Sequence, residues 1–296
     1  MIVQKINNTE LIKDVEILFL VENSVYTSKL FAEHGLAIYL RGHFLNGKEF
    51  KVLFDTGQTG ISLINNIKNL KVDLTNLDGI VFSHGHYDHT GGIKHFLESY
   101  NDNVKIYCHP EVFKKKYSVN NQKKRDIGLP FNRKLIESLG GIFKEITKPT
   151  QIVGGIFTTG EIERTNDFEK VPDRFKKLED GELIQDDIID DLALILNTPE
   201  GIILVTGCGH SGVVNTIHHS LKISNSNKVL GLFGGFHLID ANFSKVNTTI
   251  DNLKKIDIET IGACHCTGSF AASLLINEYV GQYRYCSTGV KLVFKF

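Results

Sequence analysis

Residues 83–89 are Ser83-His84-Gly85-His86-Tyr87-Asp88-His89, and they bring four side chains of metal-ligand type into six positions. Neutral imidazoles and carboxylates bind zinc and similar divalent ions well. His84 and His86 flank Gly85, so both can face one ion, whereas Asp88 and His89 follow one turn later and can address a second ion. We therefore predict a metal site with His84, His86, Asp88 and His89 as ligands.

A polar helix cap is the competing interpretation of this stretch. In that case Asp88 caps a helix and the histidines are solvated. Burying four such side chains without a metal is costly because each one needs a polar partner. The short apolar strand expected at 80–82 runs directly into the cluster. We therefore favour a metal site at a strand end.

The elements on either side of the cluster indicate the fold. Before it we expect strands at 15–21, 35–41 and 50–54, a hairpin turn at Asn46-Gly47 and a helix at 61–69. After it we expect a helix from 91, a strand at 104–108, strands at 192–196 and 202–205 joined by the turn 198–201, helices at 212–222 and 245–255, and strands at 228–233, 259–263 and 290–294. Hairpins followed by strand–helix alternation, in two halves, predict an α/β sandwich with two sheets inside and helices outside.

The segment 110–190 differs in character from the rest of the chain. Its hydrophobic periodicity is weak, and lysines crowd at 114–116 and 123–125. We expect a helix near 132–139 and strand pieces near 151–163. The sequence thus predicts one domain, 1–296, in which 110–190 is an inserted, cap-like segment over the core.

The order His-x-His-x-Asp-His after an apolar strand resembles the signature of the metallo-β-lactamase superfamily. Asp55-Thr56-Gly57 resembles that family's first motif, in which the Asp hydrogen-bonds a ligand histidine and fixes its tautomer; the alternative is that Asp55 only forms a turn. The resemblance implies an αββα sandwich and two divalent metal ions, foremost Zn²⁺, with iron or manganese also suitable. It also implies three further ligands: a histidine, a bridging Asp and a final histidine.

Two later strand ends offer those ligands, with one departure from the family pattern. Cys208 stands where the bridging Asp is implied, in Thr206-Gly207-Cys208-Gly209-His210. Either Cys208 is a thiolate ligand, or the bridge is absent and His210 reaches the metal. We favour His210 and expect Cys208 to be a buried packing residue. His265 matches the final histidine, and its neighbours Cys264 and Cys266 are interpreted as packing residues, with a separate Cys-x-Cys zinc site as a minor alternative.

Two further residues are candidates for binding substrate. His237 follows a strand and either lines the pocket or is a structural histidine with its own partners. Arg164 lies in the cap-like segment and either binds a phosphate through its guanidinium group or is a solvated surface residue.

Several motifs together resemble one subfamily. They are Glu33-His34-Gly35, Cys208-x-His210-Ser211-Gly212, Gly234-Gly235-Phe236-His237-Leu238 and His265-Cys266-Thr267-Gly268. The set is similar to the subfamily named for 7,8-dihydropterin-6-yl-methyl-4-(β-D-ribofuranosyl)aminobenzene 5′-phosphate synthase. The resemblance implies an enzyme that acts on a phosphorylated small molecule, by hydrolysis or by condensation with diphosphate release. Asp88 is then the catalytic carboxylate, and His237 and Arg164 are the substrate-binding residues.

The composition and the motifs limit the classes of function that remain possible. The 296 residues carry a formal net charge of −1, which gives no general attraction to nucleic acid or anionic membranes. A phosphodiesterase or nuclease on this fold stays open because of the lysine runs, as does a non-catalytic metal-binding sensor. A flavodiiron-like oxygen reductase is excluded, since it needs a carboxylate in place of His86 and usually a flavin domain.

Two features of the sequence indicate the cellular compartment. Its longest N-terminal apolar run, 17–21, is strand-sized, and no secretory signal is recognisable. Five scattered cysteines argue against a disulfide framework. We therefore expect a cytoplasmic protein with a small-molecule substrate and no membrane partner.

Overall fold

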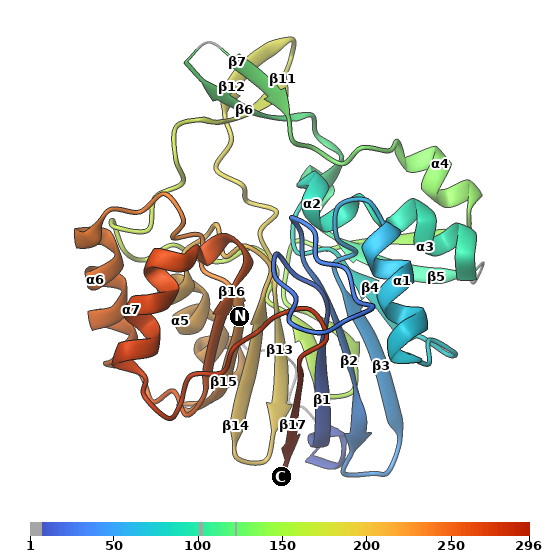
Figure 1. Cartoon of the computed structure of the whole chain (residues 1–296), viewed down its shortest axis with the longest axis vertical. Helices are drawn as coiled ribbons and strands as arrows, with labels where there is room; N and C mark the ends of the chain where they lie inside the picture. The colour runs from blue at the N-terminus through green and yellow to red at the C-terminus, as the bar shows by residue number, and fades with distance from the viewer. Residues whose placement is uncertain (1–7, 101–102, 122) are drawn as a thin grey trace.

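The molecule is built around two large sheets, with helices on the outer side of each (Figure 1). The computed structural model describes residues 8–100, 103–121 and 123–296. The first sheet has seven strands, in the order β17 (Lys291–Lys295), β1 (Ile12–Val21), β2 (Ala37–Phe44), β3 (Glu49–Phe54), β4 (Gly79–Val81), β5 (Val104–Cys108) and β8 (Gly141–Glu145). The second has six, in the order β16 (Ile261–Cys264), β15 (Val229–Gly235), β14 (Gly201–Thr206), β13 (Ala193–Thr198), β10 (Ile156–Thr158) and β9 (Thr150–Val153).

A third, smaller sheet stands above the two large ones at the top of Figure 1. Its four strands are β12 (Glu182–Gln185), β11 (Phe175–Glu179), β6 (Lys116–Asn120) and β7 (Lys123–Asp126). We call these four strands the cap sheet.

The helices cover the outer faces of the large sheets. The α-helices are α1 (Ile61–Leu70), α2 (Tyr87–Thr90), α3 (Ile93–Tyr100), α4 (Arg133–Ser138), α5 (Val213–Ser224), α6 (Phe243–Leu253) and α7 (Ser269–Glu278), and the 3₁₀ turns are Asn8–Glu10, Pro110–Phe113 and His265–Thr267. One apolar core, which includes Phe54 and Val205, lies between the two sheets. Two others lie under the helices, and they contain Ile67 of α1 and Ile217 of α5. This is the αββα sandwich that the sequence predicts.

The segment 110–190 is less separate than the sequence suggests. Its strands β8, β9 and β10 extend the two large sheets, because their apolar residues, such as Phe143 and Phe157, are buried there. Among the described residues of 110–190, the cap sheet and its connections project from the sandwich (Figure 1). The strands of the cap sheet were not expected, since β7 is wholly charged (Lys-Lys-Arg-Asp) and fully exposed. The predicted domain begins at residue 1, and its first seven residues lie outside the described structure.

α7 is a helix that the sequence did not predict, because its apolar residues are spread around the helix and only Ala271 and Leu275 are buried. No helix among the described residues is long and apolar enough to cross a membrane.

Candidate metal centre

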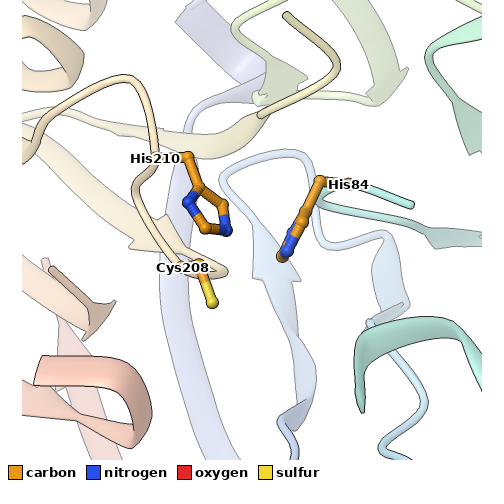
Figure 2. Close-up of side chains that lie close together, drawn as sticks. All are labelled: His84, Cys208 and His210. Atoms are coloured by element: carbon orange, nitrogen blue, oxygen red, sulfur yellow. The ribbon is translucent and has the colours of Figure 1, made fainter. Parts of the chain in front are cut away.

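The candidate ligands gather where strands of both large sheets end. His84 to His89 follow β4, Cys208 and His210 follow β14, and His265 follows β16. β4, β14 and β16 each have a parallel neighbour, and the carboxyl ends of such strands form the usual binding edge of α/β sheets. Figure 2 shows His84 and His210 on separate loops, pointing toward one another, with Cys208 close below.

The loop after β4 brings the imidazole rings of His84 and His86 close together. Nε2 of His84 lies 2.9 Å from Nδ1 of His86, and both side chains are buried. Nε2 of His86 is buried without a hydrogen-bond partner. α2 starts at His86 as its N-cap, and no side chain caps it. The helix-cap interpretation of Asp88 is therefore wrong.

Asp55 holds the next ligand of this loop in place. Its carboxylate accepts hydrogen bonds from the backbone N–H and the hydroxyl of Ser83, both at 2.7 Å. The same carboxylate lies 2.7 Å from Nδ1 of His89. Asp55 has a φ of 61°, an uncommon angle for a residue with a side chain. With Nδ1 held by Asp55, His89 presents Nε2 to the centre.

His265 is fixed in a similar way by two residues of the loop that follows β1. Its backbone N–H donates to the Glu22 carboxylate at 2.8 Å, and its Nδ1 lies 2.9 Å from the amide oxygen of Asn23. Its Nε2 lies 3.1 Å from Nε2 of His89. The Asp88 carboxylate is 3.5 Å from Nε2 of His265 and 3.2 Å from Nε2 of His34. These atoms form a second group of donors around one place.

Cys208 and His210 come from one tight loop. Gly207 permits it, since a Cβ there would lie 2.1 Å from the Ser83 hydroxyl, and Gly209 has a φ of 66°. Both ring nitrogens of His210 are buried without a hydrogen-bond partner. The sulfur of Cys208 lies 3.2 Å from Nε2 of His89. The sequence posed these two residues as alternatives, yet the loop brings both to the centre.

The donor atoms fall into three overlapping groups, each with its atoms within 4.8 Å of one another. The groups are His84, Cys208 and His210; His89, Cys208 and His265; and His34, Asp88 and His265. Cys208 belongs to the first two groups. Buried imidazole nitrogens without partners are costly in a protein interior unless something binds them. The residues present therefore fit bound divalent metal ions.

Most of the protonation states suit cation binding. At His89, burial lowers the pKa, but the carboxylates of Asp55 and Asp88 raise it above the usual value. Burial lowers the pKa of His86 to about 3, and it holds the pKa values of His84 and His210 well below the usual range. Burial raises the pKa of Asp88, but His89, His265 and His34 around it bring that pKa well below its usual value. Neutral imidazoles beside an ionised carboxylate are the forms that ligate metals. Burial raises the pKa of Cys208, so its thiolate needs an adjacent cation.

The cap sheet contributes an aromatic wall to the centre. Phe175 of β11 is buried, and its ring centroid lies 5.5 Å from that of His86, 5.4 Å from that of His210 and 5.6 Å from that of His237. The ring of His237 is 4.2 Å from that of His210. The structure therefore brings His237 next to the ligand candidates, as expected for a residue that lines the pocket.

Arg164 does not reach this cluster through any contact among the described residues. Its guanidinium group donates to the backbone carbonyls of Asp187 and Ile188. Two other arginines contact aromatic residues beside the cluster. Arg125 of β7 lies 5.5 Å from the ring of Tyr87, and Arg174 lies 4.7 Å from the ring of Phe175. The role of Arg164 in phosphate binding stays a prediction.

Sequence reasoning gave little weight to several residues of the site. His34 was a weaker candidate than His237 for lining the pocket, and Asn23 gave no signal. Lys116 lies in a lysine run that suggests a solvated surface, yet it is fully buried and bonds Asp186 and Asp190, each at 2.9 Å. Asp190 in turn accepts the N–H of Gly85 at 2.8 Å.

Comparisons with known proteins agree with this geometry. The family model described as "Metallo-beta-lactamase superfamily" matches residues 36–265. A protein of Methanocaldococcus jannaschii, named 7,8-dihydropterin-6-methyl-4-(beta-D-ribofuranosyl)-aminobenzene-5'-phosphate synthase, is 34% identical over 285 residues, which cover 94% of this chain and 96% of the relative. An uncharacterized protein of the same organism is also 34% identical, over 89% of this chain and 96% of its own length.

Solved structures show the same fold. Tm1679, described as a metal-dependent hydrolase of the β-lactamase superfamily, superposes with a TM-score of 0.81 and 25% identity, over 95% of this chain and all of the other. Zn²⁺-bound PqqB from Methylobacterium extorquens superposes with a TM-score of 0.54 at 12% identity, over 94% of this chain and 99% of its own.

Proposed function

The chain belongs to the metallo-β-lactamase superfamily and is an enzyme, and from this premise we propose a dinuclear metal-dependent activity on a phosphorylated small molecule. The observation that carries the proposal is the overlap of two donor groups at Cys208. A single structural zinc site is closed by four ligands. Two groups that share one thiol instead suit two ions side by side.

We assign the ligands by the groups that their atoms form. His84, His86 and His210 hold the first ion, and Asp88, His89 and His265 hold the second. Cys208 lies between the two groups and takes the bridging place. This proposal departs from our expectation that Cys208 only packs. Zn²⁺ is the first choice of metal because it accepts imidazole, carboxylate and thiolate alike, and iron or manganese are alternatives.

Divalent ions bound there would lower the pKa of a coordinated water and neutralise the oxygens of a phosphate group. The chain's own residues would bind the substrate and exclude water. Asp88 places its carboxylate at the open side, where it also bonds the exposed His34. Phe175 and His237 cover the first group and exclude water from it. His237 would contact the substrate, and Arg125, Arg174 and Arg164 are the candidate partners of its phosphate.

The relative's name favours one reaction in particular. A synthase that joins a dihydropterin to a ribofuranosylaminobenzene phosphate needs a leaving group, and departing diphosphate would be held by the same ions. We therefore propose this condensation as the specific activity. Hydrolysis of a phosphoester is the second candidate, because Tm1679 is described as a hydrolase.

Metal analysis combined with two assays tests the proposal. Protein grown with zinc, iron and manganese should contain more than one equivalent of metal. It should release diphosphate from a dihydropterin methyl diphosphate in the presence of the ribofuranosylaminobenzene phosphate. Bis(4-nitrophenyl) phosphate tests hydrolysis in parallel. Protein with less than about half an equivalent of metal would rule out the dinuclear centre.

A further inference from the structure

A cavity of about 470 Å³ lies directly beside the metal centre. His265 forms part of its wall, and Nε2 of the same ring faces His89 on the other side. Asn23, which bonds Nδ1 of His265, also lines the cavity. A molecule in this cavity is therefore one imidazole ring away from the ions that we propose. The volume is within the usual range of small-molecule sites.

The wall of the cavity is aromatic and apolar. Three tyrosines line it, namely Tyr26, Tyr283 and Tyr285, and the rings of the last two lie 5.5 Å apart. Tyr26 is 83% exposed and Tyr285 is 67% exposed, so neither ring is part of the folded core. Exposed aromatic rings beside a cavity offer stacking surfaces to a planar ligand.

The charges around the cavity favour a neutral occupant over an anionic one. None of the described residues that line it is Lys or Arg. Its one carboxylate, Glu22, already accepts hydrogen bonds from Ser24 and from the backbone N–H of His265. The arginines near the centre, Arg125 and Arg174, belong to the cap sheet and its approach instead. A phosphate group would be drawn toward the cap side and away from the cavity.

We propose that this cavity binds the neutral, planar heteroaromatic end of the substrate, a pterin-like bicyclic ring, by stacking on Tyr285 and Tyr26. This inference rests on the proposed function, because the reacting bond must lie at the ions beside His265. Polar groups on the wall, such as the Asn23 amide and the Ser269 hydroxyl, are available to the ring's nitrogens and oxygen. The phosphorylated end then extends toward the cap sheet.

Binding of 6-hydroxymethylpterin, which is fluorescent and carries no phosphate, tests the proposal. The metal-loaded protein should quench its fluorescence on titration. Tyr285→Ala should weaken binding about tenfold, whereas Tyr285→Phe, which keeps the stacking ring, should stay within about twofold of the wild type. Ala272→Phe fills the cavity from α7 and should abolish binding.

Phe270→Ala is the matched control. Phe270 is a 50%-exposed aromatic residue on the same helix, but it does not line the cavity. Metal content is measured for every variant, since loss of metal would show damage to the centre. Pterin binding that is absent from the wild type, or unchanged in both Tyr285→Ala and Ala272→Phe, would overturn the proposal.

Two other outcomes separate this proposal from its alternatives. A wild-type dimer in light scattering that dissociates in Tyr285→Ala, with no pterin bound, would make the tyrosines an interface between two copies. Pterin binding that follows the variants as expected, in protein that turns over neither phosphate substrate, would support the cavity while the proposed function fails.

Discussion

At the residue scale, Cys208 is the residue on which the chemistry of the centre depends. Its sulfur belongs to both donor groups, and it lies 3.2 Å from Nε2 of His89. Aspartate is the residue that the family resemblance implies in this place. A thiolate is a softer donor than a carboxylate, and it favours zinc over magnesium or manganese. The presence of Cys208 in place of an aspartate therefore affects which metal the site would prefer.

X-ray absorption distinguishes a ligand Cys208 from a packing Cys208. Zinc–sulfur bonds are about 2.3 Å long, and zinc–imidazole bonds are about 2.0–2.1 Å. We expect a sulfur shell in the wild type that is lost in Cys208→Ser. Cys108→Ser serves as the control, because Cys108 is a buried thiol on β5 that belongs to none of the donor groups. A spectrum of nitrogen and oxygen alone would return Cys208 to the packing role.

Asp88 provides the second residue-scale prediction. Asp88→Asn removes the negative charge but preserves the size of the side chain, and an amide oxygen holds a cation poorly. We expect turnover to fall by more than about a hundredfold, with the second ion lost first. The metal-free variant should still fold, because no side chain caps α2 and the helix does not depend on Asp88. Unfolding of the metal-free variant would contradict the assignment.

Where a motif holds the candidate ligands, the sequence predicted that they lie close together. His84, His86, Asp88 and His89 share one short loop, so the pattern itself shows their proximity. His34 and Asn23 reach the centre from the loop after β1, far from the motif in sequence. Contacts of that kind depend on the packing of sheets, and no local pattern encodes them.

At the element scale, the buried ion pairs of Lys116 link the cap sheet to the ligand loop. Lys116 on β6 bonds Asp190, and Asp190 accepts the N–H of Gly85 between His84 and His86. All of these groups are buried. A buried charge that loses its partner is strongly destabilising. The cap sheet and the first ion's ligands are therefore expected to form one cooperative unit.

Lys116→Met tests this link. It leaves Asp186 and Asp190 buried without their cation, which costs about 3–5 kcal/mol. We expect a lower melting temperature, measured by thermal unfolding, and weaker metal binding, measured by competition with a chelator. Lys177→Met is the control, because Lys177 on β11 pairs with Glu111 at 2.7 Å but does not contact the ligand loop. Equal effects of the two variants on metal affinity would refute the link.

The sequence predicted the sandwich strands other than β8 and missed the cap strands for one physical reason. Strands such as β3 and β14 bury apolar residues, so their pattern is visible. β7 and β12 consist mostly of charged or exposed residues and are held by backbone pairing to β6 and β11. Hydrophobic periodicity cannot reveal such strands.

At the scale of the whole molecule, the centre joins the two halves of the sandwich. The first half supplies His84 to His89, and the second supplies Cys208, His210 and His265. The apolar core between the sheets, which includes Phe54 and Val205, also holds the halves together. The metal ions that we propose would add a second connection at the strand ends, where nitrogens of His86 and His210 are buried without partners.

Metal removal is therefore expected to loosen both halves together. A ligand present at a thousandfold its Kd stabilises a fold by about 4 kcal/mol, and for a protein of this size that corresponds to roughly 10 °C in the melting temperature. Chelation should produce a loss of this order, measured by calorimetry. In hydrogen exchange, amides after both β4 and β14 should lose protection. The double variant His84→Ala/His265→Ala should melt at the same temperature with and without chelator. If chelation exposes only one of the two strand ends, the ions belong to one half and do not bridge the sandwich.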